Sequence, residues 1–274
     1  MHLAIDVGNT ETMLGLFGPD ALEPEAHWRI SSRVARTGDE LRLLLAALLG
    51  TGGVELSQLD RAVLGSVVPA QIGVFRDALS SVLPPDAFLS IDSDAELPIR
   101  LDVEEPRTVG ADRIVNTLAA THLFKRDTIV VDLGTATTYD CITADGVFVG
   151  GVIAPGLQAG REWLKGQTAK LPTVELGPPE LVIGRRTETC VQSGLFHGAV
   201  AAVDGIVDRI REEWERPDAF VVSTGGWAVA LSPHTRSIQA VHPHLTLLGL
   251  ELAGRYRFGE MSARSTDQAE AVAD

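Results

Sequence analysis

IDVGNTET, residues 5–12, is similar to a later stretch of the chain, VDLGTATT at 131–138. In each stretch an apolar, strand-like run ends in Asp-x-Gly and continues into hydroxyl or amide residues. The carboxylate can hold a cation, the glycine lets a ligand approach the backbone, and the N–H and hydroxyl groups of the turn can donate to phosphate oxygens. A single turn of this kind is weak support, because an aspartate at a strand end commonly bonds its own turn. Two of them favour a pair of phosphate-binding loops.

The elements around the two turns also come in the same order. Each half has three strand-like runs, then helical patterns, then a further strand; the predicted strands are 3–8, 12–17, 26–31, 61–69, 87–92, 128–134, 138–143, 147–154 and 219–226. Helical patterns cover 37–49, 71–83, 110–124 and 187–214. This order resembles the actin, Hsp70 and hexokinase-like (ASKHA) proteins. We therefore expect an α/β fold of two ribonuclease H-like domains facing a central cleft, 1–118 and 119–258, with a mobile tail at 259–274.

Charge and composition point to a small-molecule partner. The 274 residues carry a net charge of −14, which repels nucleic acid phosphates and anionic membranes. The apolar stretch at 41–50 is too short to span a bilayer, which takes about 20 residues. The first six residues lack the basic and apolar regions of a signal peptide, and two cysteines, Cys141 and Cys190, are too few for a disulfide framework. We expect a cytoplasmic protein that binds neither nucleic acid nor membrane.

The two turns also imply a cation requirement. The chain has neither G-x-x-x-x-G-K-[ST] nor a G-x-G-x-x-G after a strand, and its three lysines, Lys125, Lys165 and Lys170, lie outside the glycine turns. A bare carboxylate beside a phosphate is repulsive, whereas an intervening cation reverses that sign. Metal ions held by Asp6 and Asp132 are therefore expected to neutralise the phosphates of a nucleotide.

A phosphotransferase also needs a group that receives the proton of the attacking hydroxyl. Asp112, in VGADRIVN, begins a predicted helix, where the helix dipole favours an ionised carboxylate, and it follows a Gly-Ala turn that could admit a substrate. A plain helix cap is the alternative role. Arg113 could pair with a substrate carboxylate or with Glu104 or Glu105, and the sequence does not choose between them.

Taken together, these segments resemble the type III pantothenate kinases from Met1 to about Leu250. Beyond the two turns, the resemblance rests on HWRISS with RTGDEL, GSVVP, EEPRTVGADRIVN, GGVIAPGL, TAKLPTVEL, IGRRTETCVQSGLFHG, STGG and LTLLGL. It implies transfer of the ATP γ-phosphate to the primary hydroxyl of pantothenate, the first step towards coenzyme A. It also implies a homodimer with the site near the subunit interface, and a monovalent cation, K⁺ or NH₄⁺, acting together with Mg²⁺.

The resemblance assigns roles to individual residues. Asp6, Val7, Gly8, Asn9, Thr10, Glu11, Thr12 and Met13 would form the first ATP loop, and Thr135 would also contact ATP. Asp132 would hold the monovalent cation, and Asp6 would reach Mg²⁺. Gly110, Ala111, Asp112 and Arg113 would line the pantothenate site, with Asp112 as proton acceptor. Thr187 would bind pantothenate, although a threonine that opens a long helix can also be its cap.

Several positions depart from the family's pattern. Val103 stands where many relatives have a substrate-contacting tyrosine, and Glu11 adds negative charge beside the phosphate loop. His242 and His244 replace common acids; a pair without a third ligand is expected at the surface rather than in a zinc site. Two rival functions stay open, a non-catalytic nucleotide-binding relative linked to gene regulation and another small-molecule ASKHA kinase. The three aspartates argue for catalysis, since a binding module needs no base.

Overall fold

The computed structural model describes residues 1–167 and 171–261, which divide into two compact units. The first contains Met1–Ala119 together with the chain from Thr246 onward, and the second is Ala120–Leu245. The division after Ala119 lies next to the expected boundary. The expected second domain, 119–258, is longer than the second unit, because the last helix packs in the first unit.

Two expectations fall partly on residues that are not described. Of the expected mobile tail, 259–274, the described part ends at Met261, and within it Glu260 forms an ion pair with Arg61. The first three residues of TAKLPTVEL, 168–170, lie outside the described residues, and Lys170 is one of them.

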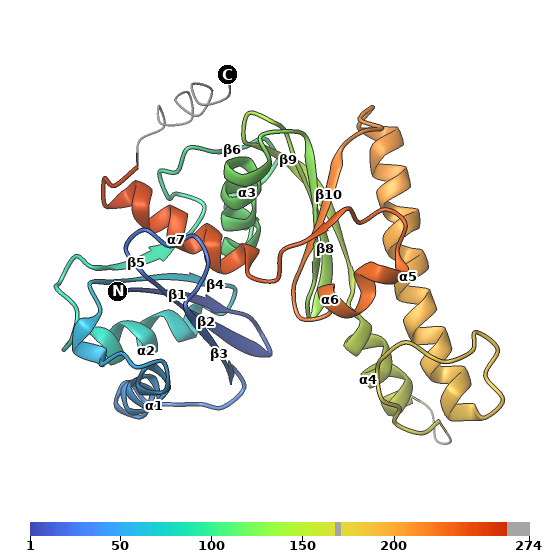
Figure 1. Ribbon diagram of the computed structural model, residues 1–274, viewed down its shortest axis with the longest axis horizontal. Coiled ribbons are helices and arrows are strands. Elements are labelled where there is room, and N and C mark those ends of the chain that lie inside the picture. Colours follow the sequence, from blue (N-terminus) through green and yellow to red (C-terminus); the bar gives the residue numbers. More distant parts are fainter. Residues whose placement is uncertain (168–170, 262–274) are drawn as a thin grey trace. The chain divides into compact units, whose positions relative to one another are not determined.

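The first unit is built on a five-stranded sheet in the order β3-β2-β1-β4-β5 (Figure 1). Its strands are β1 (His2–Val7), β2 (Glu11–Phe17), β3 (Ala26–Ser31), β4 (Arg61–Ser66) and β5 (Phe88–Ile91). The first three pair antiparallel, whereas β4 pairs parallel to β1 and to β5. Antiparallel neighbours need only tight turns, and parallel neighbours need crossovers, here supplied by helices. The predicted strands of the first half are confirmed, except that the strand expected over 61–69 ends at Ser66 and Pro69 already begins α2.

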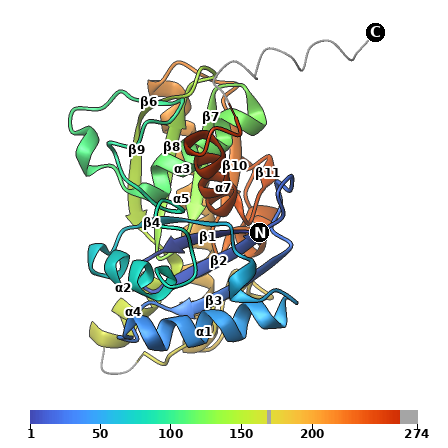
Figure 2. The ribbon, with the colours of Figure 1, turned by 90° about the vertical axis from the view of Figure 1, so that its left-hand side faces the viewer.

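Helices cover both faces of this sheet. On one face, α1 (Gly38–Thr51) and α2 (Pro69–Leu79) bury Leu41, Leu45 and Phe75 in one cluster with Ile5. On the other, α7 (Leu245–Arg257) is so close that a Cβ on Gly15 of β2 would lie 2.9 Å from Leu247. Figure 2 shows α1 and α7 on opposite sides of β1 and β2. Short segments complete the unit: η1 (Leu56–Gln58), β6 (Arg100–Leu101) and η2 (Pro106–Thr108).

The second unit repeats the strand order of the first. Its strands are β7 (Thr128–Leu133), β8 (Ala136–Ile142), β9 (Val147–Pro155), β10 (Phe220–Thr224) and β11 (Ala240–Val241), arranged as β11-β10-β7-β8-β9. Strands β7, β8 and β9 pair antiparallel, and β10 pairs parallel to β7 and β11. The helices are α3 (Ala111–Phe124), which starts in the first unit, α4 (Leu157–Gln167), α5 (Thr187–Glu213) and α6 (Ala228–Leu231), followed by η3 (Ser232–His234). The repeat predicted from the two turns is therefore a repeat of sheet topology.

The structure corrects how the two turns correspond. Val7 pairs with Thr12 across the first hairpin, and Leu133 pairs with Thr137 across the second, so the second turn is one residue shorter. The burial pattern along β2 is the same as that along β8 when Glu11 is matched with Ala136. Thr12 therefore corresponds to the buried Thr137, and not to Thr138 as a gapless comparison of the two stretches suggests.

Helix α5 is the longest helix of the second unit. Val203 and Val207 on one face pack in a core with Val131 and Leu133. Among the described helices, α5 alone is long and apolar enough to cross a membrane, and 22% of its most apolar 18-residue window is buried. A core helix of a soluble protein passes the same test of length and composition.

Candidate active site

The first glycine turn, in the first unit, joins β1 to β2. Asp6 is half-buried at the end of β1, and the Gly8 N–H donates to the Glu11 carbonyl at 3.0 Å. Asn9 and Glu11 are exposed, so their side chains can reach a ligand. Val7 and Thr12 are buried, and any contact they make with ATP is through their backbone. The Thr12 hydroxyl is already hydrogen-bonded to Ser32 at 2.8 Å.

The second glycine turn, in the second unit, is surrounded by two further glycine segments. A Cβ on Gly156 would lie 2.4 Å from the Thr135 carbonyl oxygen, so the chain after β9 passes directly against this turn. Gly225, at the end of β10, has φ +90°, and a Cβ there would lie 2.3 Å from Oδ1 of Asp132. Only glycine fits either position without displacing the turn. The half-buried Asp132 carboxylate thus lies over the STGG segment, while Thr135 is exposed.

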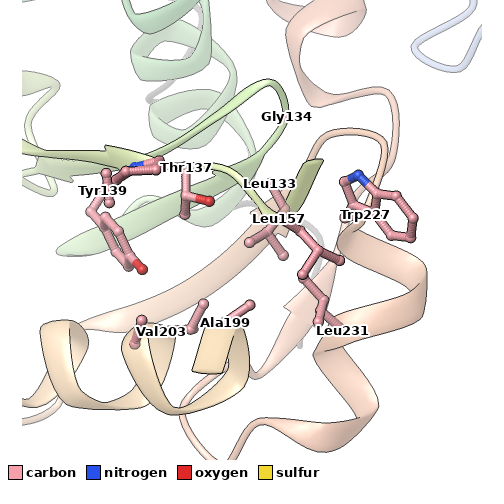
Figure 3. Close-up of a pocket in the computed structure, with 12 residues that line it drawn as sticks. Leu133, Gly134, Thr137, Tyr139, Leu157, Ala199, Val203, Trp227 and Leu231 are labelled. Atoms are coloured by element: carbon pink, nitrogen blue, oxygen red, sulfur yellow. The ribbon is translucent and has the colours of Figure 1, made fainter. Parts of the chain in front are cut away.

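A small cavity lies beneath this second turn (Figure 3). Its volume is about 30 Å³, room for about one water molecule and far too little for a nucleotide. Thr137 and Tyr139 project from β8 towards the helix that carries Ala199 and Val203. Burial, with a smaller effect from the Asp204 charge, raises the pKa of Tyr139 to about 12, so its hydroxyl stays protonated. The cavity is part of the packing that supports the turn.

Trp227 belongs to the same supporting layer. It lines the cavity, packs against the core of the second unit, and donates its backbone N–H to the Leu133 carbonyl at 3.0 Å. Trp227 thus has a packing role, and its backbone ties the STGG segment to the end of β7.

Asp112 lies in the first turn of α3, in the first unit. The Ile114 N–H donates to the Gly110 carbonyl, so Gly110 caps the start of the helix, and Oδ1 of Asp112 accepts the Arg113 N–H at 2.9 Å. A Cβ on Gly110 would lie 2.4 Å from that Oδ1, so the carboxylate lies back over the glycine. Burial raises the pKa of the Asp112 carboxyl, while the N–H and the charge of Arg113 act against that rise. A carboxylate with a raised pKa is a better proton acceptor than an exposed one.

Close packing fixes the helix that carries Asp112. A Cβ on Gly249 of α7 would lie 2.1 Å from the Val115 carbonyl oxygen, so α7 and α3 touch backbone to backbone. The Thr246 hydroxyl donates to Oδ1 of the buried Asn116 at 3.0 Å. On the other side, a Cβ on Gly65 of β4 would lie 3.4 Å from Ala111. GSVVP and LTLLGL thus contain the residues that hold α3 in place.

The structure also places the remaining predicted residues. Thr187 is the first residue of α5, but the capping hydroxyl is that of Thr189, which accepts the Arg186 N–H at 3.1 Å. The alternative that Thr187 is the cap is therefore wrong, and its exposed side chain can meet a substrate. Val103 is half-buried, and Glu104 and Glu105 are exposed.

Two groups of predicted site residues emerge, one in each unit. In the first unit they are the 6–13 turn and Gly110–Arg113, and in the second they are Asp132, Thr135 and Thr187. That the two turns grip one nucleotide stays a prediction. Ser32, Gly156 and Gly225 were missed as individual residues, although HWRISS, GGVIAPGL and STGG contain them.

The carboxylate oxygens of Asp6 and Asp132 at the two turns suit a hard cation, one that also binds phosphate oxygens. Among residues 1–167 and 171–261, no group of three or more His, Cys, Asp and Glu side chains could hold a metal ion. His242 and His244 are half-buried rather than fully exposed. Asp6 and Asp132 offer single carboxylates, and Mg²⁺ is commonly bound by one or two carboxylates plus substrate phosphates. The residues present therefore fit a nucleotide-bound cation better than a cage made by protein alone.

Comparisons with known proteins identify the family of this chain. The family model for type III pantothenate kinase matches residues 2–209. The chain is 41% identical over 252 residues to the type III pantothenate kinase of Syntrophotalea carbinolica, covering 92% of this chain and 97% of the relative. It is 40% identical over 255 residues to that of Parafrankia sp., covering 92% and 96%.

Solved structures share the fold at much lower identity. A conserved putative Baf family transcriptional activator from Campylobacter jejuni matches with a TM-score of 0.58 at 15% identity, covering 94% of this chain and all of that chain. A putative 2-dehydro-3-deoxygalactonokinase from Sinorhizobium meliloti matches with a TM-score of 0.53 at 14% identity, covering 93% and 98%. The fold is that of the ASKHA kinases, and the chain belongs to the type III pantothenate kinase family.

Proposed function

We propose that this protein phosphorylates pantothenate with ATP, giving 4'-phosphopantothenate, the first step of coenzyme A biosynthesis. The observation that carries the proposal is the 41% identity to a protein named for this activity, over 92% of the chain. The half-buried carboxylate of Asp112, lying over Gly110 at a helix start, is the group that the reaction needs.

In this reaction Asp112 orients the primary hydroxyl of pantothenate and takes its proton as the phosphoryl group arrives. Because phosphoryl transfer passes through a loose transition state, positioning and charge neutralisation contribute more than a strong base does. Gly110 leaves room for the Asp112 carboxylate to lie back over the backbone, and Arg113, half-buried next to it, would pair with the pantothenate carboxylate. Thr187 would supply a further hydrogen bond to the substrate.

The two glycine turns would hold ATP. Residues 6–13 and Thr135 would donate backbone N–H and hydroxyl groups to the phosphates. Asp132 would hold a monovalent cation, K⁺ or NH₄⁺, and Asp6 would reach the Mg²⁺ that accompanies ATP. Bound there, these cations would offset the negative charge of the triphosphate. The three lysines of the chain are too few to do so.

A homodimer in the cytoplasm is part of the same proposal. The segment before α5 exposes Leu181, Val182 and Ile183 side by side, and α5 itself is little buried. Exposed apolar clusters of this kind mark interaction surfaces. A second copy of the chain would cover them, and the net charge of −14 disfavours nucleic acid and anionic membranes as partners.

The decisive experiment measures ADP formation by the purified protein with ATP, Mg²⁺ and either K⁺ or Na⁺, with and without pantothenate. We expect ADP only when pantothenate is present, and faster formation in K⁺. ADP formed equally without pantothenate would point to another acceptor, and nucleotide binding without turnover would point to a regulatory relative.

Replacing Asp112 tests the proposed base. We expect Asp112→Asn to lower kcat by about 10²- to 10⁴-fold, the usual contribution of general base catalysis, while ATP binding stays intact. In the unchanged enzyme, burial raises the pKa of Asp112 above its ordinary value of 3.8. As the pH falls, Asp112 should therefore be protonated, and the rate should drop, at a higher pH than for an ordinary aspartate. An unchanged kcat in the variant would remove Asp112 from this role.

A further inference from the structure

In the first unit, one serine connects the phosphate turn to the end of the third strand. Ser32 directly follows β3 and makes three hydrogen bonds. Its N–H donates to the Thr10 carbonyl at 3.0 Å, its hydroxyl bonds the Thr12 hydroxyl at 2.8 Å, and its carbonyl accepts from Gln71 at 3.4 Å. Thr10 and Thr12 both belong to the turn predicted to bind ATP. Ser32 itself is not in that turn.

In the second unit, the corresponding residue is a glycine. Glu11 pairs with Ser31, the last residue of β3, and Ala136 pairs with Pro155, the last residue of β9, so Ser32 and Gly156 occupy the same place in the repeat. Gly156 lies against the turn as Ser32 does. A Cβ there would lie 2.4 Å from the Thr135 carbonyl oxygen and 2.6 Å from that of Gly134.

The two units therefore brace their phosphate turns at the same point by different means. In the first, a side chain bonds the turn, and in the second, the backbone itself fills the space. In both units the backbone at this point also lies against a carbonyl oxygen of the turn: the Ser32 N–H donates to the Thr10 carbonyl, and a Cβ on Gly156 would lie 2.4 Å from that of Thr135. When a carbonyl is held on the far side of a turn, the peptide is oriented so that the opposite, N–H side can face an anion.

We infer that Ser32 and Gly156 are positioning residues for the two phosphate turns, and that the Thr12 hydroxyl acts through Ser32 rather than on ATP. Thr12 is 2% exposed, and its hydroxyl has a partner at hydrogen-bond distance. Its role is to fix the turn so that the backbone N–H groups and the exposed side chains keep the arrangement that a triphosphate needs. This inference rests on the proposed function.

The test on the first unit compares Ser32→Ala with Ser31→Ala, an exposed serine at the end of β3 whose hydroxyl accepts the Arg33 N–H at 3.3 Å instead of bonding Thr12. Binding of a non-hydrolysable ATP analogue with Mg²⁺ is measured by titration calorimetry, and KM for ATP and for pantothenate are measured separately. Loss of one neutral hydrogen bond corresponds to about a fivefold change. We expect Ser32→Ala to raise Kd for the analogue and KM for ATP by about fivefold, with KM for pantothenate unchanged and Ser31→Ala like the unchanged protein.

A double-mutant cycle tests whether Thr12 and Ser32 act together. We expect Thr12→Val to weaken nucleotide binding as much as Ser32→Ala does, and the double variant to be no weaker than either. Thr12→Ser and Ser32→Thr keep both hydroxyls and should restore binding. The inference is overturned if the binding losses of the two single variants add up in the double variant, or if neither change affects nucleotide binding. If one of these variants is unstable, the conservative variants Thr12→Ser and Ser32→Thr still test the hydrogen bond.

Gly156→Ala tests the second unit, with Gly166→Ala as its control. No described atom lies within 4 Å of a Cβ on Gly166, which is on exposed α4. We expect Gly156→Ala to weaken binding of the analogue by about tenfold or more, because the turn must move to admit the methyl group, and Gly166→Ala to leave it unchanged. Equal binding by the two variants contradicts the inference.

The binding assay keeps the two proposals separate. A protein that binds the analogue but does not phosphorylate pantothenate would refute the proposed function, and the order of the Kd values would still decide the roles of Ser32 and Gly156.

Discussion

Gly249 lies where α7 and α3 touch, and replacing it with alanine sets two effects against each other. Alanine in a helix is favoured over glycine by about 0.5–1 kcal/mol. The added methyl group, however, would lie 2.1 Å from the Val115 carbonyl oxygen and 2.6 Å from its carbon, both rigid backbone atoms. Overpacking of this kind costs about 1–3 kcal/mol. The clash should win, leaving a net loss of about 1–2 kcal/mol in the free energy of unfolding.

That loss should appear as a lower melting temperature. At about 2–4 °C per kcal/mol for chains of roughly this size, differential scanning calorimetry should show Gly249→Ala melting several degrees below the unchanged protein. Because α3 carries Asp112, kcat should fall as well, while Kd for ATP changes little.

Gly73 provides the matched control for this experiment. It lies on the exposed face of α2, and no described atom comes within 4 Å of a Cβ placed there. Only the helix preference remains, so Gly73→Ala should raise the melting temperature by a few degrees. If both variants melt at or above the temperature of the unchanged protein, the backbone contact between α7 and α3 does not constrain the helix as argued.

Three further predictions concern charges and glycines. Asp132→Ala should raise the K⁺ concentration that gives half-maximal rate, and an unaltered K⁺ titration would exclude it as the cation ligand. Burial alone would raise the pKa of Glu251, but hydrogen bonds from His2 and Arg255 and the Arg61 charge outweigh it and lower the pKa below 4.5. The stability that Glu251 contributes is therefore complete above that value and is lost as the pH falls below it. Glu251→Gln should make the free energy of unfolding, measured by urea titration, fall less steeply with decreasing pH. Gly225→Ala, at φ +90°, should lower the free energy of unfolding by about 1–2 kcal/mol or more, whereas Gly226→Ala, with no described atom within 4 Å of its Cβ, should melt close to the unchanged protein.

Much of the fold could be predicted because its signals are local. Alternating apolar runs around the two Asp-x-Gly turns predict β1–β3 and β7–β9, and the Thr37 to Glu40 capping box marks the start of α1. The site aspartates could be named because each stands at a strand or helix end.

What could not be predicted depends on contacts between distant segments. The shorter second turn cannot be recognised without the strand register, so a gapless comparison of the two sequences pairs Thr12 with Thr138 instead of Thr137. The packing of α7 in the first unit depends on contacts of Gly249 with Val115 and of Gly254 with Val63, both of which are far away in the sequence. The role of Ser32 likewise needs the hydrogen bond to Thr12, because a serine after a strand has no distinguishing pattern.

The return of α7 also bears on how the protein is made. On the ribosome, Ala120–Leu245 emerges as one continuous unit, whereas the first unit lacks α7 until all of the second unit has been translated. Before Glu251 has been translated, the guanidinium of Arg61, which is buried in the folded protein, lacks its ion-pair partner Glu251. We therefore expect the half of the chain that is translated first to mature last.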